Sequence, residues 1–164
     1  MTRRLILMRH AKSSWSSPAL NDHARPLNKR GRASATALGG WLRRAGYIPD
    51  TILSSSAERT RETAARLKFD VPATFTNALY HAGPRRMLAA LAGAEAQTVL
   101  MLGHNPGIAE FADLLVAAHP DHPRFLDYPT GATLVAEFPV SDWYEIRFGI
   151  GKAIDFMVPR DLLE

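Results

Sequence analysis

The stretch Leu5-Ile6-Leu7-Met8-Arg9-His10-Ala11-Lys12-Ser13 sets the frame for the rest of the chain. Its continuous apolar start is typical of a strand buried in a parallel or mixed sheet. Ligands of open α/β sheets bind beyond the carboxyl ends of the strands, so Arg9 and His10 are predicted to lie where such a fold does its chemistry. Taken alone, the dipeptide favours a simpler interpretation, a strand ending at the surface, because short motifs match many sequences by chance.

Composition bounds the class of protein. The 164 residues fit a single domain, 1–164, and 46% hydrophobic with 22% charged residues is ordinary for a globular chain. The absence of cysteine excludes a disulfide framework and a thiolate site, and makes the cytoplasm the expected compartment. Apolar runs are too short for a membrane span or a secretion signal, and nothing points to an obligate oligomer, so we expect a monomer with no membrane partner.

The net charge of the chain gives only weak information about its partners. Lys and Arg number 20 against 16 Asp and Glu, for a net charge of +4, which suggests an anionic partner. The positive residues are scattered in short groups, with no long basic block and no RNA-binding aromatic motif. We interpret most of them as solvated helix faces and expect no nucleic-acid partner.

Hydrophobic periodicity and turn residues predict an alternation of strands and helices. Strands are expected at 5–8, 51–53, 74–77, 98–102, 132–138 and 143–148, and helices at 29–45, 58–68, 84–91 and 106–115. Stretches 12–20, which includes Pro18, and 119–131 are expected to be loops. The order predicts a three-layer α/β/α sandwich with a mostly parallel central sheet.

Several element ends carry recognisable signals. Asn28 and Gly46 are expected to begin and end the first helix. Ser55 and Glu58 have the spacing of a capping box for the next helix. Asn105 is expected to cap the helix that starts at Pro106, and residues 139–142 are expected to join the last two strands as a hairpin.

Three strand-to-helix junctions present residues with phosphate chemistry: Arg9-His10, Arg59 and His104. Arginine matches phosphate oxygens bidentately, and histidine acts as nucleophile or acid near neutral pH. The chain has no Gly-x-x-x-x-Gly-Lys loop and no aspartate cage among these residues. The combination predicts metal-free phosphoryl transfer through a phosphohistidine.

The other histidines and the tryptophans are given simpler roles. No His/Asp/Glu spacing suggests zinc, so no metal and no cofactor are expected. The loop histidines are expected at the surface: His23, His119 and His122. The tryptophans are expected to be packing residues: Trp15, Trp41 and Trp143.

These motifs resemble the histidine phosphatase superfamily, the phosphoglycerate mutase-like proteins. Arg9-His10-Ala11 is similar to the superfamily's Arg-His-Gly signature, and the alanine is similar to the SixA-type phosphohistidine phosphatase branch. The matching motifs recur in the family's order: Asp22-x-x-Arg25-Pro26-Leu27, Ser54-Ser55-x-Ala57-x-Arg59-Thr60 and Gly103-His104-Asn105-Pro106. The resemblance covers roughly Leu5 to Gly107 by motif.

The resemblance implies roles for particular residues. His10 corresponds to the nucleophile. The phosphate pocket corresponds to Arg9, Arg59 and His104. Ser13 and Asn105 either contact the ligand or cap local structure. Arg25 is expected to clamp a loop with Asp22, with its guanidinium able to reach the pocket mouth.

One departure from the family bears on the substrate. Where many superfamily members carry a carboxylic acid after the third strand, this chain has His81 following Leu79-Tyr80. His81 either protonates the leaving oxygen or is an uninvolved surface residue. A phosphohistidine substrate needs no strong acid, because its imidazole departs neutral when the other ring nitrogen is protonated.

Three functional hypotheses follow. The first is a cofactor-independent phosphatase acting on protein phosphohistidine, since the chain is short for the cap insertions that this family uses to select small molecules. The second keeps the pocket but acts on a small phosphomonoester. The third is a binding module for phosphate or nucleic acid, and the presence of every pocket residue speaks against it. The sequence leaves open the physiological substrate, the general acid and the partner kinase or phosphocarrier.

Overall fold

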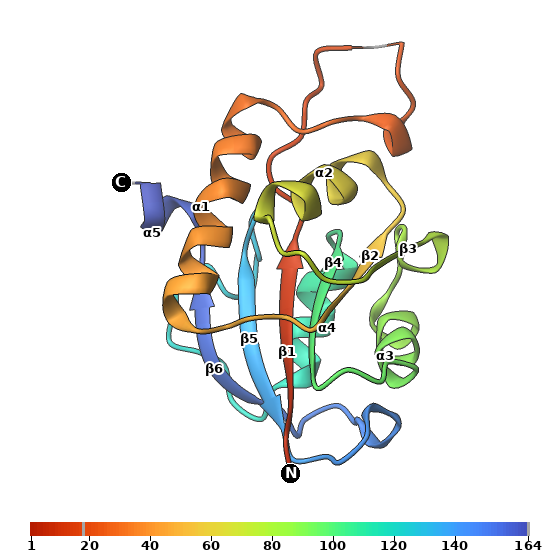
Figure 1. The fold of residues 1–164 in the computed structure, drawn as a ribbon, viewed down its shortest axis with the longest axis vertical. Coiled ribbons are helices and arrows are strands. Elements are labelled where there is room, and N and C mark those ends of the chain that lie inside the picture. The colour runs from red at the N-terminus through yellow and green to blue at the C-terminus, as the bar shows by residue number, and fades with distance from the viewer. Residues whose placement is uncertain (18, 164) are drawn as a thin grey trace.

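The computed structural model describes residues 1–17 and 19–163 and contains a central six-stranded sheet. The strand order is β3-β2-β4-β1-β5-β6, with β1 in the interior of the sheet (Figure 1). The strands are β1 (Arg3–Arg9), β2 (Thr51–Ser55), β3 (Ala73–Thr76), β4 (Thr98–Gly103), β5 (Thr133–Phe138) and β6 (Lys152–Met157). β1, β2, β3 and β4 pair in parallel, and β5 runs antiparallel to both of its neighbours. The prediction of a mostly parallel sheet is confirmed.

Helices cover both faces of this sheet. They are α1 (Lys29–Ala45), α2 (Glu58–Leu67), α3 (Pro84–Ala92), α4 (Gly107–Leu115) and α5 (Pro159–Leu163). Alternate side chains of β1 point to opposite layers: Leu5 and Leu7 pack in the core with α3 and α4, whereas Ile6 and Met8 pack with α1 and α2. All four are fully buried, as their unbroken apolar run predicted. The three-layer α/β/α prediction is confirmed (Figure 1).

The ends of α1 follow the predicted chemistry. The side chain of Asn28 accepts a hydrogen bond from the backbone N–H of Gly31 at 2.8 Å. Gly46 adopts a left-handed conformation with φ of 80° and donates its N–H to the carbonyl oxygen of Arg43. Helix α1 therefore begins and ends at residues whose identities suit these conformations.

The prediction of a last strand at 143–148 is wrong. Trp143–Glu145 form a 3-10 turn with a capping box between Asp142 and Glu145, and β6 begins only at Lys152. The Trp143 side chain is buried, and its Nε1 donates to the carbonyl oxygen of Ala96 at 2.6 Å. The apolar run thus fills the core from a turn, through Trp143 and Ile146, and residues 139–142 join no hairpin.

Two predicted helix caps are also wrong. The Ser55 hydroxyl makes no capping box with Glu58; it accepts from the N–H of Ala57 at 3.2 Å and contacts His104. Asn105 makes no cap for α4, because its amide donates to the carbonyl oxygens of Asp127 and Tyr128. Both side chains serve long-range contacts that spacing along the chain does not reveal.

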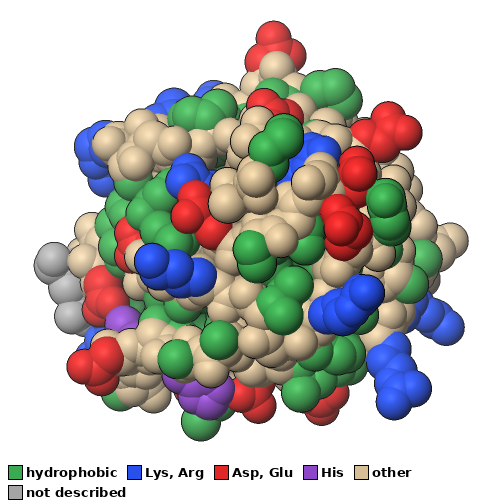
Figure 2. Space-filling model, turned by 90° about the horizontal axis from the view of Figure 1, so that it is seen from below, with side chains coloured by type: hydrophobic (Ala, Val, Ile, Leu, Met, Phe, Trp, Pro, Cys, Tyr) green, Lys and Arg blue, Asp and Glu red, His purple; other side chains and the backbone are tan. Residues whose placement is uncertain are grey.

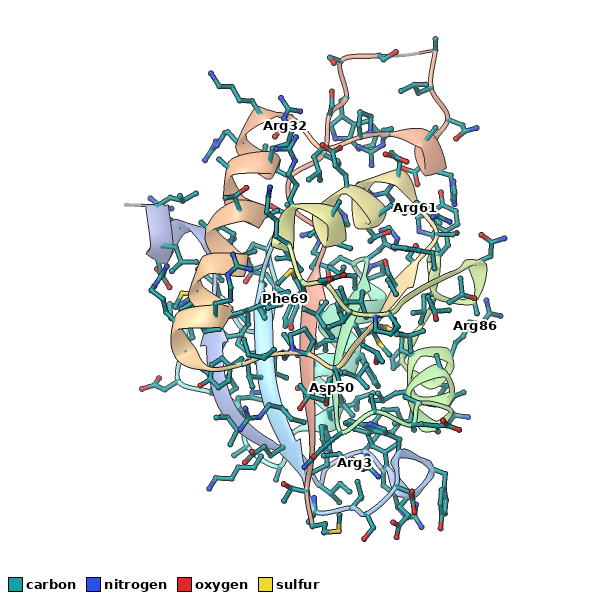
Figure 3. All side chains as sticks on the ribbon, in the orientation of Figure 1. Arg3, Arg32, Asp50, Arg61, Phe69 and Arg86 are labelled. Atoms are coloured by element: carbon teal, nitrogen blue, oxygen red, sulfur yellow. The ribbon has the colours of Figure 1, made fainter. Side chains whose placement is uncertain are left out.

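The parallel strands bring their carboxyl ends to one end of the sheet. Arg9 of β1 pairs with Gly103 of β4, so the residues that follow these strands are neighbours. Arg3 and Asp50 lie toward the opposite end, where Asp50 accepts a hydrogen bond from the N–H of Thr98 (Figure 3). Pro18, part of the loop predicted at 12–20, lies outside the described residues. None of the described helices has the length and apolar character needed to cross a membrane.

Candidate active site

A cavity of about 300 Å³ opens beyond the carboxyl ends of β1, β2 and β4. Every site residue predicted from the sequence lines it: Arg9, His10, Ser13, Arg25, Arg59, His81, His104 and Asn105. Four further lining residues are Lys12, Trp15, Asp22 and Thr130. The tertiary structure therefore brings together side chains from positions 9 to 130 of the chain, as the strand-end argument requires.

His10 is held in one protonation pattern. Its ring is 5% exposed, and its Nδ1 lies 2.7 Å from the carbonyl oxygen of Ala11. A carbonyl oxygen only accepts, so Nδ1 carries the proton and Nε2 keeps its lone pair. Burial is the main cause that lowers the pKa of His10 to about 3; the charges of Arg9 and Arg59 add to this lowering, and the Ala11 contact opposes it. His10 is therefore a neutral imidazole at neutral pH.

His104 lies beside His10, with 5.2 Å between the ring centroids. Its Nε2 lies 2.8 Å from the Ser55 hydroxyl, which itself accepts from the N–H of Ala57. Among the described residues no other acceptor is available for the Ser55 hydroxyl proton, so we assign that proton to the contact with Nε2, which leaves the His104 proton on Nδ1. Burial, followed by the neighbouring His10 and Arg59, depresses the pKa of His104 well below its usual value.

Several buried polar atoms around this cavity lack a hydrogen-bond partner among the described residues. They are Nε of Arg9, Nε of Arg59, Nδ1 of His104 and Oδ1 of Asn105. A buried donor without a partner is costly, so its presence calls for a functional explanation. Three of these four atoms are nitrogens suited to donate, and an anion with several oxygens matches such a set.

Asp22 connects the positive side chains of the cavity. Its Oδ2 lies 3.0 Å from Nη2 of Arg59 and 2.5 Å from the Tyr80 hydroxyl, and its Oδ1 lies 3.1 Å from Nη2 of Arg25. Burial alone raises the pKa of Asp22, but the hydrogen bonds from Tyr80 and Arg59 outweigh it and hold that pKa well below the usual range. Asp22 is therefore a carboxylate that partly neutralises the arginines.

His81 lies at the edge of the cavity. Its side chain is half-exposed, its Nε2 is 3.2 Å from Oδ2 of Asp22, and its ring centroid is 5.7 Å from that of His104. Its φ of 55° is a left-handed conformation, uncommon for a residue other than glycine. The loop geometry thus turns this imidazole toward the ionised Asp22.

Ser13, Arg25 and Trp15 form the wall nearest solvent. Nη1 of Arg25 donates to the Ser13 hydroxyl at 2.8 Å, and the Arg25 guanidinium carbon lies 3.4 Å from the centroid of the Trp15 ring. The Trp15 side chain is 76% exposed, so its prediction as a packing residue is wrong. The prediction of a surface position for His23 is also wrong, because its Nε2 bonds the Ser56 hydroxyl in a partly buried contact.

The sequence argument missed three contributors to this site. Sequence spacing predicts only a clamp between Asp22 and Arg25, although the Asp22 carboxylate also bonds Arg59. It predicts a helix cap for Ser55 and no role for Tyr80. The signal for Ser55 was available, because Ser55 ends β2 and the neighbouring strand β4 leads directly into His104. In the described ranges 1–17 and 19–163, no group of His, Cys, Asp or Glu is arranged to hold a metal ion.

Comparison with known sequences finds relatives in bacteria and plants. A Mycobacterium tuberculosis (strain H37Rv) protein, Rv1276c, is 32% identical over 160 residues, which cover 93% of this chain and 100% of that protein. The chloroplastic Arabidopsis thaliana protein At3g52155 is 39% identical over 134 residues. That match covers 72% of this chain and 61% of the Arabidopsis protein, so this chain spans less than two thirds of that relative.

Solved structures resemble the whole fold. A SixA protein from Nakamurella multipartitia superposes with a TM-score of 0.84 at 31% identity, covering 97% of both chains. The protein histidine phosphatase SixA complexed with tungstate superposes with a TM-score of 0.78 at 19% identity, covering 97% of this chain and 99% of that one. The second likeness concerns the fold alone.

The fold and cavity define a class of protein, an α/β/α sandwich whose parallel strands deliver two histidines and two arginines to one cavity. The sequence profile of the histidine phosphatase superfamily (branch 1) matches residues 5–83, a segment that holds His10 and Arg59. The chain belongs to this superfamily, in its SixA-type branch. Membership and the SixA-like neighbours together support phosphatase activity, which is a hydrolase reaction.

Proposed function

We propose that residues 1–164 form one phosphatase domain that removes the phosphoryl group of protein phosphohistidine by transferring it to Nε2 of His10. The observation that carries this proposal is the 2.7 Å contact between Nδ1 of His10 and the carbonyl oxygen of Ala11. It supports a nucleophilic role because it keeps the proton on Nδ1 and the lone pair on Nε2, in a residue that lines the cavity.

Binding of the phosphoryl group is assigned to Arg9, Arg59 and His104. Their partnerless nitrogens supply donors to the phosphoryl oxygens, where the charge of the transition state lies. The Ser55 hydroxyl directs Nδ1–H of His104 toward the ligand. Ser13, Arg25 and Asn105 shape the wall around the bound group, with Arg25 held by Asp22.

The transfer step proceeds without a cofactor. Nε2 of His10 attacks phosphorus in line, and the bond from phosphorus to the substrate's imidazole nitrogen breaks as the new P–N bond forms. The leaving imidazole departs neutral when its other nitrogen carries a proton. A water molecule then attacks phosphorus, its proton passes to the phosphate, and His10 is released with Nδ1 still protonated.

Among the described residues, Asp22 is the one acidic side chain that lines the cavity. Hydrogen bonds from Tyr80 and Arg59 hold its pKa low, so it is ionised and is a poor proton donor, which favours a P–N substrate. One observation favours the second candidate, a small phosphomonoesterase: His81 lines the cavity, with its Nε2 3.2 Å from Oδ2 of Asp22. A histidine in this place is able to serve as the proton donor that an ester oxygen requires.

A single-turnover reaction tests the proposed function. Wild type, His10→Ala and His119→Ala are mixed with a phosphohistidine-bearing protein in EDTA. His119 is the matched control, because it is an exposed histidine that does not line the cavity. We expect wild type and His119→Ala to release phosphate through an acid-labile phosphoenzyme, and His10→Ala to form none.

The outcomes separate the candidates. Turnover of sugar phosphates with no reaction of the phosphohistidine protein would move the function to small phosphomonoesters with the same nucleophile. Phosphate release by His10→Ala at the wild-type rate would refute the role of His10. Inertness of wild type toward both substrate classes would leave a phosphate-binding module, and salt-dependent association with DNA or RNA would then be measured.

A further inference from the structure

A second and larger cavity, of about 650 Å³, lies beside the candidate active site. It is bounded by the first turns of α1, the loop before β5 and the short helix α5. Lys12 and Thr130 line both this cavity and the one that contains His10. The two cavities therefore share a wall, and a ligand whose phosphoryl group lies at His10 has the second cavity directly next to it.

This cavity is here called the basic groove, because all the charged side chains that line it are positive. Its charged members are Lys12, Arg30, Arg124 and Arg160, and no Asp or Glu of the described chain lines it. Arg124 is paired with Asp127 through Nε at 2.9 Å. Lys12 and Arg30 are both exposed, and neither forms an ion pair with any residue in 1–17 or 19–163.

The uncharged lining favours a peptide over a bare ion. Pro129, Val158 and Leu163 supply apolar surface between the cations. A lining that combines cations with apolar side chains complements a segment that carries carboxylates and an apolar side chain. The opposite end of the molecule looks different, because positive, negative and hydrophobic side chains are interspersed there (Figure 2).

We propose that the basic groove binds an acidic segment of the partner protein, next to its phosphohistidine, and thereby selects the phosphoprotein. This inference rests on the proposed function and adds a second recognition element to it. The phosphoryl group specifies the chemistry at His10, whereas carboxylates of the flanking segment pair with Arg30 and Lys12. Because these pairs lie near the surface, binding weakens as salt rises.

The test compares two charge reversals at adjacent positions of α1. Arg30→Glu removes a groove cation, and Lys29→Glu makes the same change in net charge at an exposed residue that lines neither cavity. Both place a carboxylate in the first turn of a helix, where it is compatible with folding. Circular dichroism verifies that both variants are folded.

The probes are synthetic peptides. One carries histidine followed by a glutamate-rich segment with one leucine, and the other has glutamine in place of each glutamate. Fluorescence anisotropy of the unphosphorylated peptides measures groove binding without catalysis. The same peptides, phosphorylated on histidine, give kcat and KM. Turnover of N-phosphoimidazole (imidazole phosphate), which is too small to contact the groove, measures the rate of P–N cleavage at His10 alone.

We expect wild type and Lys29→Glu to bind the acidic peptide similarly and Arg30→Glu to bind it about 10-fold more weakly. For Arg30→Glu, KM for the acidic phosphopeptide rises by the same factor, while kcat and turnover of imidazole phosphate stay unchanged. Equal weakening by both variants, or wild-type binding that does not distinguish the two peptides, would overturn the groove proposal. Failure to cleave any phosphopeptide would instead count against the proposed function, since peptide binding is measured independently.

Discussion

Oδ2 of Asp22 lies 3.0 Å from Nη2 of Arg59, and this contact ties a carboxylate to the arginine that faces the cavity beside His10. The same carboxylate oxygen accepts from Tyr80. Asp22 therefore holds Arg59 in place and also competes with an incoming oxyanion for its positive charge. The sequence places these residues 37 positions apart, so only the fold reveals the pair.

Asp22→Asn is expected to tighten oxyanion binding. The amide keeps a hydrogen-bond acceptor for Arg59 but removes a negative charge from the cavity wall. We expect the inhibition constant of phosphate to fall by about 3- to 10-fold, which corresponds to roughly 1 kcal/mol. Competitive inhibition assays measure this change. Glu58→Gln, which removes a carboxylate that does not line the cavity, serves as control, and weaker inhibition of Asp22→Asn would contradict the competition.

Asp22 also predicts a pH dependence of stability. Its pKa is lower in the folded than in the unfolded protein, against an ordinary value of 3.8. The folded state therefore gains stability from the ionised carboxylate above about pH 4, and loses it as the pH falls below that value. We expect Asp22→Asn to lose less free energy of unfolding than wild type between pH 5 and pH 3. Urea unfolding at the two pH values measures the difference, and parallel losses would count against it.

The imidazole of His10 is expected to stay neutral where free histidine titrates. Its pKa is about 3, against an ordinary value of 6.5, because burial disfavours the charged ring. Stability from this neutral ring is full above pH 6.5 and declines as the pH falls, since the unfolded chain then binds the proton first. NMR shifts of the His10 ring should remain constant from pH 8 to pH 5. The exposed His119 ring provides the comparison, and a His10 midpoint near 6.5 would contradict the burial argument.

Ser55 is predicted to be a positioning residue for His104. Ser55→Ala removes the hydroxyl 2.8 Å from Nε2 of His104 and frees the ring to change tautomer. We expect kcat/KM to fall about 10-fold through kcat, about 1.4 kcal/mol of transition-state stabilisation. Ser54→Ala is the matched control, because Ser54 is equally buried but its hydroxyl bonds the carbonyl oxygen of Ser55. Equal losses in both variants would indicate a packing effect.

Gly31 is predicted to be irreplaceable because α1 approaches the loop after His10. A Cβ at Gly31 would lie 2.0 Å from the backbone oxygen of Lys12, so Gly31→Ala must displace that loop. We expect a loss of about 1–3 kcal/mol of stability, with reduced activity. Gly40→Ala in the same helix meets only the flexible end of Arg44 and should stabilise by up to about 1 kcal/mol. Thermal unfolding measures both, and a neutral Gly31→Ala would refute the close approach.

Much of the fold was predictable because the local signals agree with it. The apolar runs at 5–8 and 98–102 form the buried strands β1 and β4. Asn28 caps the start of α1 with its side chain, and the left-handed Gly46 ends it. The strand predicted at 143–148 is wrong because a short apolar segment is compatible with either a strand or a buried turn. In the structure the segment forms a turn, which the buried Trp143 indole stabilises by bonding the carbonyl oxygen of Ala96.

The candidate site also has features that the sequence predicts and features that it does not. The sequence alone predicts eight of the twelve described residues that line the cavity, because parallel strands deliver the residues that follow them to one end of the sheet. The charge states and orientations of these residues became clear only in the folded chain. The tautomer of His10, the Ser55 contact to His104 and the neutralising Asp22 depend on burial and on contacts between distant parts of the chain. Sequence spacing carries no information about such contacts, since desolvation and hydrogen bonding act only once the chain has folded.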